Sequence, residues 1–316
     1  MSTFAMIFPG QGSQAIGMLE NLASHFPSVQ QCFAEASKVL DYDLWALTQD
    51  GPEDKLNQTA YTQPALLTAG IAVYRVWQES RGSQPSILAG HSLGEYTALV
   101  CSESLEFKDA VRLVARRGEL MQQAVPPGRG AMAAIIGLED DAVKAICDEA
   151  AEGGVLTPAN YNSLGQVVIA GDSAAVERAV TLAQATGAKL AKLIPVSVPA
   201  HCALMQPAYE EFVIDLANTP IHAPKIPVLN NVDVATPNHP DDIRDALLRQ
   251  LVSPVRWVEI IKCIIQLGIT DLIETGPGKV LAGLNKRIDR NLKTFPVYDN
   301  SSLQSALKEH SLRNTV

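Results

Sequence analysis

Short apolar segments alternate along the chain with longer segments in which apolar residues recur at every third or fourth position. The short segments are typical of buried strands and cover 4–8, 86–89, 225–229 and 270–273. The longer segments predict helices over 64–78, 93–101, 107–123, 202–216 and 257–266. This succession favours an α/β fold with a mainly parallel sheet.

One segment departs from this alternation after Pro126-Pro127-Gly128. Its pattern predicts strand, helix, strand, strand, helix and strand over 131–136, 140–151, 155–160, 166–170, 174–185 and 189–193. This βαββαβ order is that of a small ferredoxin-like unit. We therefore predict a large α/β domain formed by 1–127 and 197–316, with residues 128–196 inserted as a ferredoxin-like subdomain.

Composition narrows the classes of partner. The 316 residues include 25 Lys and Arg against 34 Asp and Glu, a formal charge of −9, so we expect no nucleic-acid partner. No apolar run is long enough to span a bilayer, so we expect no membrane partner. No Lys or Arg precedes Lys38, so the basic segment that begins a secretory signal is missing. The five cysteines are widely spaced along the chain. We expect a cytoplasmic protein with free thiols and no metal site.

A nucleophile motif follows the second predicted strand. Gly90, Ser92 and Gly94 form GxSxG between strand 86–89 and helix 93–101, which is the setting of a nucleophile elbow and of a hydrolase-like large domain. The glycines allow the strand and helix backbones to approach closely. The N–H of Leu93 would face an oxyanion, and Glu95 suits the helix dipole. The plainer alternative makes Ser92 a simple N-cap.

A serine nucleophile needs a base, and six histidines are available. We favour His201, because it follows a proline-rich loop at the start of a predicted helix. His91, adjacent to Ser92, is expected to point away from it. The remaining histidines are expected at the surface: His25, His222, His239 and His310. No Asp after Ser92 is an evident third member, so a backbone carbonyl could orient the base.

Five motifs occur in the order found in acyltransferases: 8–14 (FPGQGSQ), 90–95 (GHSLGE), 160–171 (NYNSLGQVVIAG), 198–201 (VPAH) and 274–279 (ETGPGK). From Phe4 to about Ile288 the chain resembles the malonyl-CoA:acyl carrier protein transacylase family. The resemblance implies a ping-pong reaction in which Ser92 takes malonyl from malonyl-CoA and passes it to the phosphopantetheine thiol of acyl carrier protein. It implies no permanently bound cofactor, a monomer, and a role in fatty acid elongation.

The resemblance also implies residue roles. His201 would be the base, the backbone N–H groups of Gln11 and Leu93 would form the oxyanion hole, and the main-chain carbonyl of Gln250 would orient His201. Arg117 would hold the free carboxylate of malonate through parallel hydrogen bonds. Without the resemblance, Arg117 and its neighbour Arg116 would be interpreted as two solvated side chains.

Further residues are expected to support binding. Asn160, Asn162 and Gln166 would line the acyl pocket, although the Asn residues also suit a simple turn. His91 is expected only as a supporting residue of the site. A basic face would attract the acidic carrier and the phosphates of coenzyme A. Its residues are Lys189, Lys192, Lys279, Lys286 and Arg287, with Arg290 beside them. The alternative is a helix whose exposed side happens to be basic.

Three other functions remain as alternatives. A serine esterase or thioesterase would share the elbow, but Asp50-Gly51 precedes Ser92 and Arg117 would have no role in such an enzyme. An inactive scaffold would have lost Ser92 or His201. A trans-acting acyltransferase of a polyketide pathway would have the same motifs. Ala200 stands where serine is common in the family, and this exchange is expected to leave catalysis intact and to bear only on the choice of acyl group.

Overall fold

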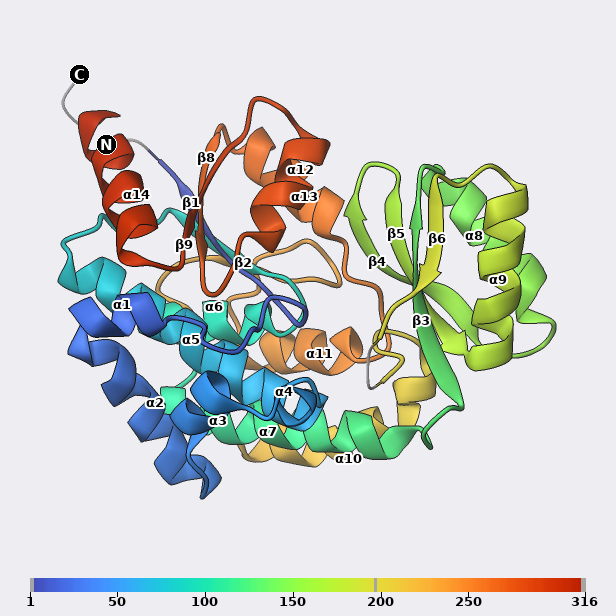
Figure 1. Ribbon diagram of the computed structural model, residues 1–316, viewed down its shortest axis with the longest axis horizontal. Helices are drawn as coiled ribbons and strands as arrows, with labels where there is room; N and C mark the ends of the chain where they lie inside the picture. The colour runs from blue at the N-terminus through green and yellow to red at the C-terminus, as the bar shows by residue number, and fades with distance from the viewer. Residues whose placement is uncertain (1–2, 196–197, 314–316) are drawn as a thin grey trace.

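The structure of the protein, a computed structural model, describes residues 3–195 and 198–313. Its strands form two separate sheets (Figure 1). The larger sheet contains β1 (Ala5–Phe8), β2 (Ile87–Gly90), β7 (Val228–Leu229), β8 (Asp271–Thr275) and β9 (Lys293–Val297). The smaller sheet contains β3 (Gly130–Ile136), β4 (Leu156–Ser163), β5 (Gln166–Asp172) and β6 (Leu190–Leu193).

The larger sheet is parallel and is covered on both faces. Its order is β7-β2-β1-β8-β9, and every pairing is parallel. Because side chains alternate along a strand, Phe4, Met6 and Phe8 enter one hydrophobic cluster, whereas Ala5 and Ile7 enter another. Burial on both sides is typical of parallel sheets. The parallel pairing of β1 and β2 places their carboxyl ends side by side.

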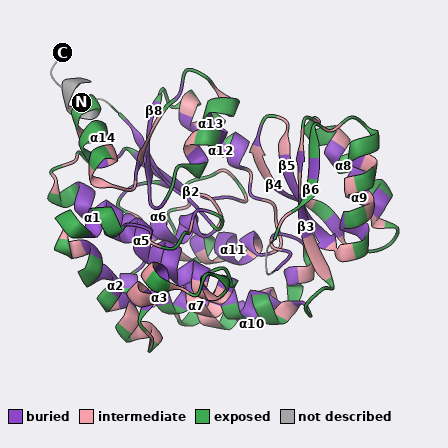
Figure 2. Ribbon diagram, in the orientation of Figure 1, coloured by how far each residue is buried: buried purple, intermediate pink, exposed green. Residues whose placement is uncertain are grey.

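Helices pack against both faces of this sheet. The hydrophobic cluster that contains Phe8 also takes residues from a layer of helices on that side of the sheet: α1 (Glu20–His25), α2 (Pro27–Leu40), α3 (Leu44–Asp50), α4 (Glu53–Leu56), α5 (Thr59–Glu79), α6 (Gly94–Cys101), α7 (Phe107–Ala124), α10 (Gln206–Asn218), α11 (Pro240–Gln250) and α14 (Asn300–Arg313). The other face meets α12 (Trp257–Gln266) and α13 (Val280–Ile288). Figure 2 shows α5 buried along most of its length. Among the described residues, none of these helices combines the length and apolarity needed to cross a membrane.

The smaller sheet is antiparallel, in the order β4-β5-β3-β6. One face packs on α8 (Asp140–Ala151) and α9 (Ser173–Ala185), which lie on its outer side in Figure 1. The opposite face contributes Met132 and Val168 to a cluster that includes Cys202. We propose residues 128–196 as a subdomain on this sheet, although the boundary at 196/197 lies outside the described residues.

The predicted fold class is confirmed: the structure is α/β, with a parallel sheet and a separate antiparallel sheet. The bounds of α12 and α8 are the predicted ones. The expected strand 225–229 is reduced to β7, because Pro224 and Pro227 have no N–H to donate to a ladder.

Other boundaries differ from the predicted ones. The predicted helix 202–216 begins as a 3-10 turn, Ala203–Met205, and becomes α10 near Pro207, which suits a first helical turn. α5 begins at Thr59, five residues before the predicted start, so Pro64 lies inside the helix, where it has no N–H to donate to the preceding turn. β9 was not expected; it pairs with β8.

Candidate active site

The nucleophile elbow forms where β2 meets α6. Ser92 has a φ of 50°, the left-handed region that is unfavourable for a residue with a side chain. A Cβ at Gly90 would overlap the backbone of Gly94, and a Cβ at Gly94 would overlap the carbonyl of Phe8. The two glycines are therefore required by the close contact of strand and helix. Ser92 stands at the carboxyl end of β2, as the motif predicts.

His201 lies against the serine. Its Nε2 is 2.8 Å from Oγ of Ser92, and its Nδ1 is 2.8 Å from the carbonyl oxygen of Gln250. A carbonyl only accepts, so Nδ1 carries the proton and Nε2 is free to accept the hydroxyl hydrogen of Ser92. Burial, assisted by the charge of Arg117, lowers the pKa of His201 to about 3. The imidazole is therefore neutral near pH 7 and able to act as a base.

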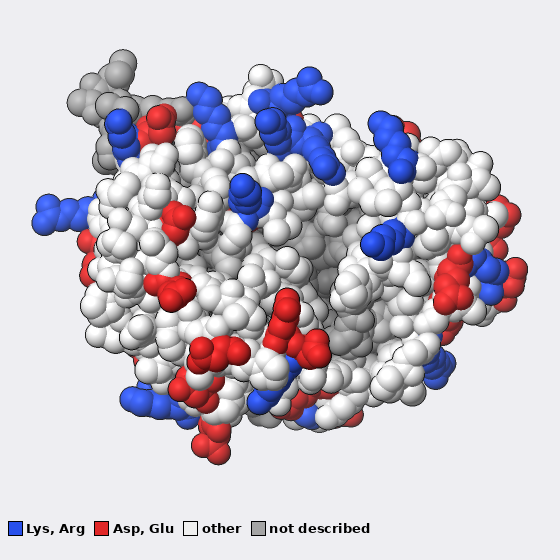
Figure 3. All heavy atoms as spheres, in the orientation of Figure 1, with Lys and Arg blue, Asp and Glu red and all other residues white. Residues whose placement is uncertain are grey.

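A cavity of about 430 Å³ opens between the two sheets at this point. Figure 3 shows the hollow on the face that is viewed in Figure 1. Strands of the smaller sheet and the segments that follow β1 and β2 of the larger sheet line it together with α7, including Gln11, Ser92, Leu93, Arg117, Met121, Met132, Asn160, Asn162 and His201. The lining places the candidate nucleophile, base and cation around one space of a size suited to a small acyl group.

Arg117 is a buried cation beside this cavity, with only 2% of its surface exposed. Nη1 donates to Oε1 of Gln63 at 2.7 Å, and Nη2 donates to Oε1 of Gln250 at 2.9 Å. The ring centroid of Tyr96 lies 5.4 Å from Cζ. Among the described residues, no carboxylate forms an ion pair with Arg117 and its Nε has no hydrogen-bond partner. Burial lowers its pKa, so an anion from outside would be stabilised here.

The interpretation of Arg116 and Arg117 as two solvated side chains is wrong for Arg117. Arg116, one residue earlier on α7, is more exposed and pairs with Glu211 at 3.1 Å and with Asp215 at 3.5 Å. Successive residues on a helix are rotated by about 100°, so only one of the two can face the core.

Two backbone N–H groups are available at the cavity for the oxyanion role. Gln11 follows β1 and Leu93 follows the serine, and both line the cavity. Within the described part of the chain, neither N–H donates to a protein acceptor. By contrast, the N–H of Ser92 is already used, since it donates to Oδ1 of Asn231 at 2.7 Å. The assignment of Gln11 and Leu93 to an oxyanion hole remains a prediction.

His91 lines the same cavity as Ser92, and the expectation that its ring points away from the serine stays a prediction. Its Nε2 lies 2.7 Å from Oδ1 of Asn162, and both residues line the same cavity as the serine. The left-handed turn at Ser92 ends the strand's alternation of side chains, which is why neighbours need not face opposite ways. Burial lowers the pKa of His91, and its ring packs 5.6 Å from that of Trp257.

The remaining predicted residues divide between cavity and surface. Asn160 is buried and lines the cavity, whereas Gln166 lies outside the lining and accepts from Nη1 of Arg287 at 2.6 Å. The other basic residues expected to face a carrier are exposed: Lys189, Lys192, Lys279, Lys286 and Arg290. His25, His222 and His239 are exposed as expected, whereas the side chain of His310 lies outside the described residues.

Sequence reasoning missed three residues around the site. Glu95 was expected only to favour the helix dipole, but it is buried and accepts hydrogen bonds from Gln250 and Asn231. Asn231 and Gln63 were not singled out. One signal was available for Asn231, because it follows a predicted parallel strand and therefore lies at the same sheet edge as Ser92.

A serine held by histidine beside a buried arginine, between a parallel sheet and a small antiparallel one, defines a serine-dependent acyltransferase. The chain belongs to the acyl transferase domain family, whose model matches residues 5–294. It is 55% identical over 98% of its length to the malonyl CoA-acyl carrier protein transacylase of Escherichia coli K12, all of which is covered. The Bacillus subtilis protein of that name is 45% identical, with 98% of this chain and 97% of that protein covered.

Solved structures of proteins named for the same transfer also match this chain. The malonyl CoA-acyl carrier protein transacylase of Coxiella burnetii matches with a TM-score of 0.96 and 53% identity, covering 97% of each chain. A malonyl-transacylase in complex with a type II polyketide acyl-carrier protein also gives 0.96, with 55% identity over 98% of this chain and 100% of that one. Both the fold and the arrangement of the two sheets are thus shared with these relatives.

Proposed function

We propose that this chain transfers the malonyl group from malonyl-CoA to the phosphopantetheine thiol of an acyl carrier protein, through a malonyl ester on Ser92. The observation that carries the proposal is the 2.8 Å contact between Oγ of Ser92 and Nε2 of His201. Relatives that match it over nearly their whole length are named for this transfer. The site residues all come from one chain, so we propose that a monomer is sufficient.

The first half-reaction forms the ester. His201 accepts the hydroxyl proton at Nε2 as Oγ of Ser92 attacks the thioester carbonyl of malonyl-CoA. The N–H groups of Gln11 and Leu93 stabilise the oxyanion that forms. The carbon–sulfur bond then breaks, and His201 gives its proton to the departing thiolate of coenzyme A. Atoms and protons balance without any permanently bound cofactor.

The second half-reaction follows the same path in reverse. The thiol of the phosphopantetheine arm loses its proton to Nε2 of His201, and the sulfur attacks the ester carbonyl. The bond between that carbonyl and Oγ of Ser92 breaks, and the serine recovers its proton. The carbonyl of Gln250 keeps His201 in the required tautomer through both steps.

Arg117 explains the preference for a malonyl group. Two of its five N–H donors are used by neutral amides, which leaves donors for a carboxylate. An acetyl group would leave the buried guanidinium unpaired, and leaving a buried charge unpaired is unfavourable. An esterase for neutral acyl groups would have no use for this side chain.

The carrier protein would dock beside the cavity on exposed basic residues. Figure 3 shows Lys and Arg side chains on the side of the hollow where α13 lies in Figure 1, whereas Asp and Glu gather on the opposite side. Lys279 is the N-cap of α13 and Lys286 lies in its last turn. Lys192 lies on β6 of the smaller sheet, and Lys189 directly precedes that strand. An acidic carrier would be attracted here although the chain as a whole has a charge of −9.

We place the reaction in fatty acid elongation. A polyketide pathway is the second candidate, because a relative of equal identity is bound to a type II polyketide carrier. The two pathways are separated by the rates of malonyl transfer to a fatty-acid carrier and to a polyketide carrier from one source organism. Faster transfer to the fatty-acid carrier indicates fatty acid elongation, and faster transfer to the other indicates the polyketide pathway.

The test of the function is the mass of the intact protein after mixing with malonyl-CoA and then with phosphopantetheinylated carrier, with Ser92→Ala as the control. We expect a malonyl adduct that requires Ser92 and moves to the carrier. An adduct lost equally fast without the carrier would identify a hydrolase, and the absence of any adduct would leave an inactive scaffold.

A further inference from the structure

We infer that Glu95 is a positioning residue whose carboxylate orients Gln250 and Asn231, and through them Arg117 and the backbone of Ser92. The inference deepens the proposed function and rests on it. Glu95 lies in the first turn of α6, three residues after the serine, and only 2% of its surface is exposed. Neither Glu95 nor these two partners is among the described residues that line the cavity, so its carboxylate acts from behind the lining.

One carboxylate oxygen receives both hydrogen bonds. Oε2 of Glu95 accepts from Nε2 of Gln250 at 2.7 Å and from the backbone N–H of Asn231 at 2.9 Å. Burial raises the pKa of Glu95 to about 7, and these two donors act against that rise. The hydrogen bonds of its carboxylate are with neutral groups, and the charge of Arg117 also acts to lower the pKa of Glu95.

The contact with Gln250 determines which way that amide faces. Nε2 of Gln250 donates to Glu95 and to the carbonyl oxygen of Ser92, the latter at 3.2 Å, so Oε1 is left to accept from Arg117. A reversed amide would set oxygen against carboxylate and N–H against N–H. Glu95 therefore fixes the one amide orientation in which Gln250 can hold the guanidinium that meets the substrate carboxylate.

The contact with Asn231 supports the nucleophile elbow. Nδ2 of Asn231 donates to the carbonyl of Gly90, and Oδ1 accepts from the N–H of Ser92, both at 2.7 Å. The side chain thus bridges the backbone on either side of His91, where Ser92 adopts its unfavourable φ of 50°. Such conformations persist only where the surroundings hold them.

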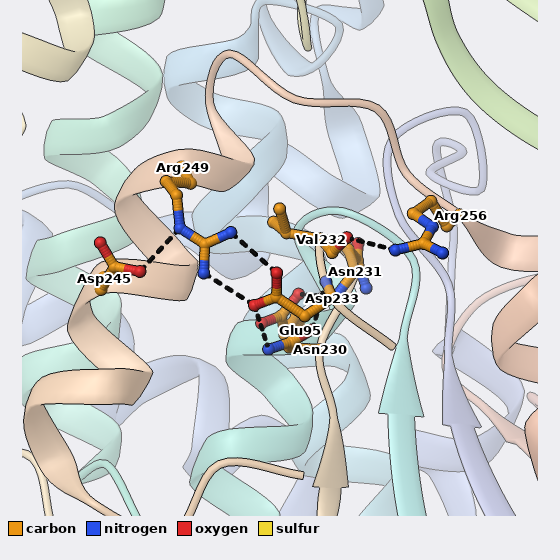
Figure 4. Close-up of polar contacts among 8 residues, drawn as sticks. All are labelled: Glu95, Asn230, Asn231, Val232, Asp233, Asp245, Arg249 and Arg256. Atoms are coloured by element: carbon orange, nitrogen blue, oxygen red, sulfur yellow. Dashed lines mark hydrogen bonds and ion pairs between the residues drawn. The ribbon is translucent and has the colours of Figure 1, made fainter. Parts of the chain in front are cut away.

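The loop that carries Asn231 is itself anchored. Figure 4 shows Glu95 beside this loop and Arg249 reaching Asp233 from α11. Nη1 and Nη2 of Arg249 lie 2.9 and 2.7 Å from the carboxylate oxygens of Asp233, and Nη1 of Arg256 donates to the carbonyl of Val232 at 2.9 Å. Since Arg249 precedes Gln250, the loop and the end of α11 are held together.

Two substitutions separate orientation from charge. Glu95→Gln keeps an oxygen at the same reach without the charge, and that one oxygen can accept both hydrogen bonds. Glu95→Asp keeps the charge but shortens the side chain by one methylene, about 1.5 Å, which breaks both contacts. The readout is the ratio of single-turnover rates of Ser92 acylation by malonyl-CoA and by acetyl-CoA, followed by intact mass.

We expect Glu95→Gln to keep the wild-type ratio within about threefold, and Glu95→Asp to lower it by about tenfold or more, the loss typical of a hydrogen bond to a charged group. Phenylmethylsulfonyl fluoride reacts with Ser92 and has no carboxylate for Arg117, so its rate reports the nucleophile elbow only. We expect this labelling to slow in Glu95→Asp and to stay at the wild-type rate in Glu95→Gln. Glu274→Gln is the matched control, a buried carboxylate that binds the N–H groups of Leu281 and Ala282 at 2.9 and 2.8 Å outside this network. It should lower the melting temperature and leave the ratio unchanged.

The opposite pattern, with Glu95→Asp like wild type and Glu95→Gln impaired, would show that Glu95 acts by charge and would overturn the inference. An equal fall of the malonyl-to-acetyl ratio in both variants would also overturn the inference, as would a lower melting temperature with an unchanged ratio in both. If Glu95→Asp does not fold, an impaired ratio in Glu95→Gln still rejects the inference. Failure of the wild-type protein to become malonylated would reject the proposed function instead, and the sulfonyl fluoride reaction would then still test the support of Ser92.

Discussion

The carbonyl oxygen of Gln250 lies 2.8 Å from Nδ1 of His201, while Ser92 occupies the other ring nitrogen at the same distance. A neutral carbonyl thus takes the place that an aspartate occupies in a serine triad. It fixes the tautomer of His201 without adding a negative charge that would favour protonation. This agrees with the lowered pKa of the ring.

Replacing the base should slow formation of the ester without preventing folding. For His201→Ala we expect acylation of Ser92 by malonyl-CoA to slow by about two to four decades, the usual contribution of general base catalysis. Quenched-flow samples read by intact mass give this rate. His222→Ala, which changes an exposed histidine, should acylate at the wild-type rate. Wild-type kinetics in His201→Ala would remove His201 from the mechanism.

The pH dependence of acylation should lack the inflection of an ordinary histidine. The neutral form of His201 is the active form, and a folded pKa of about 3 keeps the ring neutral as the pH falls through the ordinary value of 6.5. The single-turnover rate should therefore change little between about pH 8 and pH 5. A tenfold loss centred near pH 6.5 that persists in Glu95→Gln, which removes the other nearby group with a pKa of about 7, would show that the ring is not shielded as the structure indicates.

Removing the arginine should change the choice of acyl group. We expect Arg117→Ala to lower acylation by malonyl-CoA by about two decades, the loss of a hydrogen-bonded charge pair, while acetyl-CoA gains in relative terms. Arg116→Ala is the control, since its partners are Glu211, Glu119 and Asp215 at the surface. An unchanged malonyl-to-acetyl ratio in Arg117→Ala would exclude a contact with the carboxylate.

Reversing charge on the basic side should weaken transfer to the carrier. In the double variant Lys279→Glu, Lys286→Glu we expect a higher KM for carrier protein and a smaller effect of salt, with kcat nearly unchanged, because distant charges act mainly on encounter. Acylation by malonyl-pantetheine, which lacks the phosphates of coenzyme A, should be unaffected. Lys108→Glu, at the start of α7, is the control for added negative charge. Equal carrier KM values in the two variants would place the docking surface elsewhere.

Local features of the chain could be predicted because they depend on neighbours in sequence. The elbow needs only a strand, GxSxG and a helix, and α12 follows from apolar spacing within ten residues. The role of Arg117 came from motif resemblance, since spacing alone favoured a solvated side chain. The sequence did not predict β9 because Lys293–Val297 contains Lys, Thr and Pro among few apolar residues, and it becomes a strand by pairing with β8.

The sequence by itself determined the alternating α/β order, the nucleophile and, through its motifs, the acyltransferase family. Only the tertiary structure decided that Glu95 is buried, that His91 faces the cavity, and that Gln250 contacts base, nucleophile and arginine together. Glu95 meets Asn231 and Gln250 across 136 and 155 positions of the chain. Such contacts form where the ends of separate strands and helices meet. The local pattern of polar and apolar residues does not specify which side chains from those distant ends will face each other.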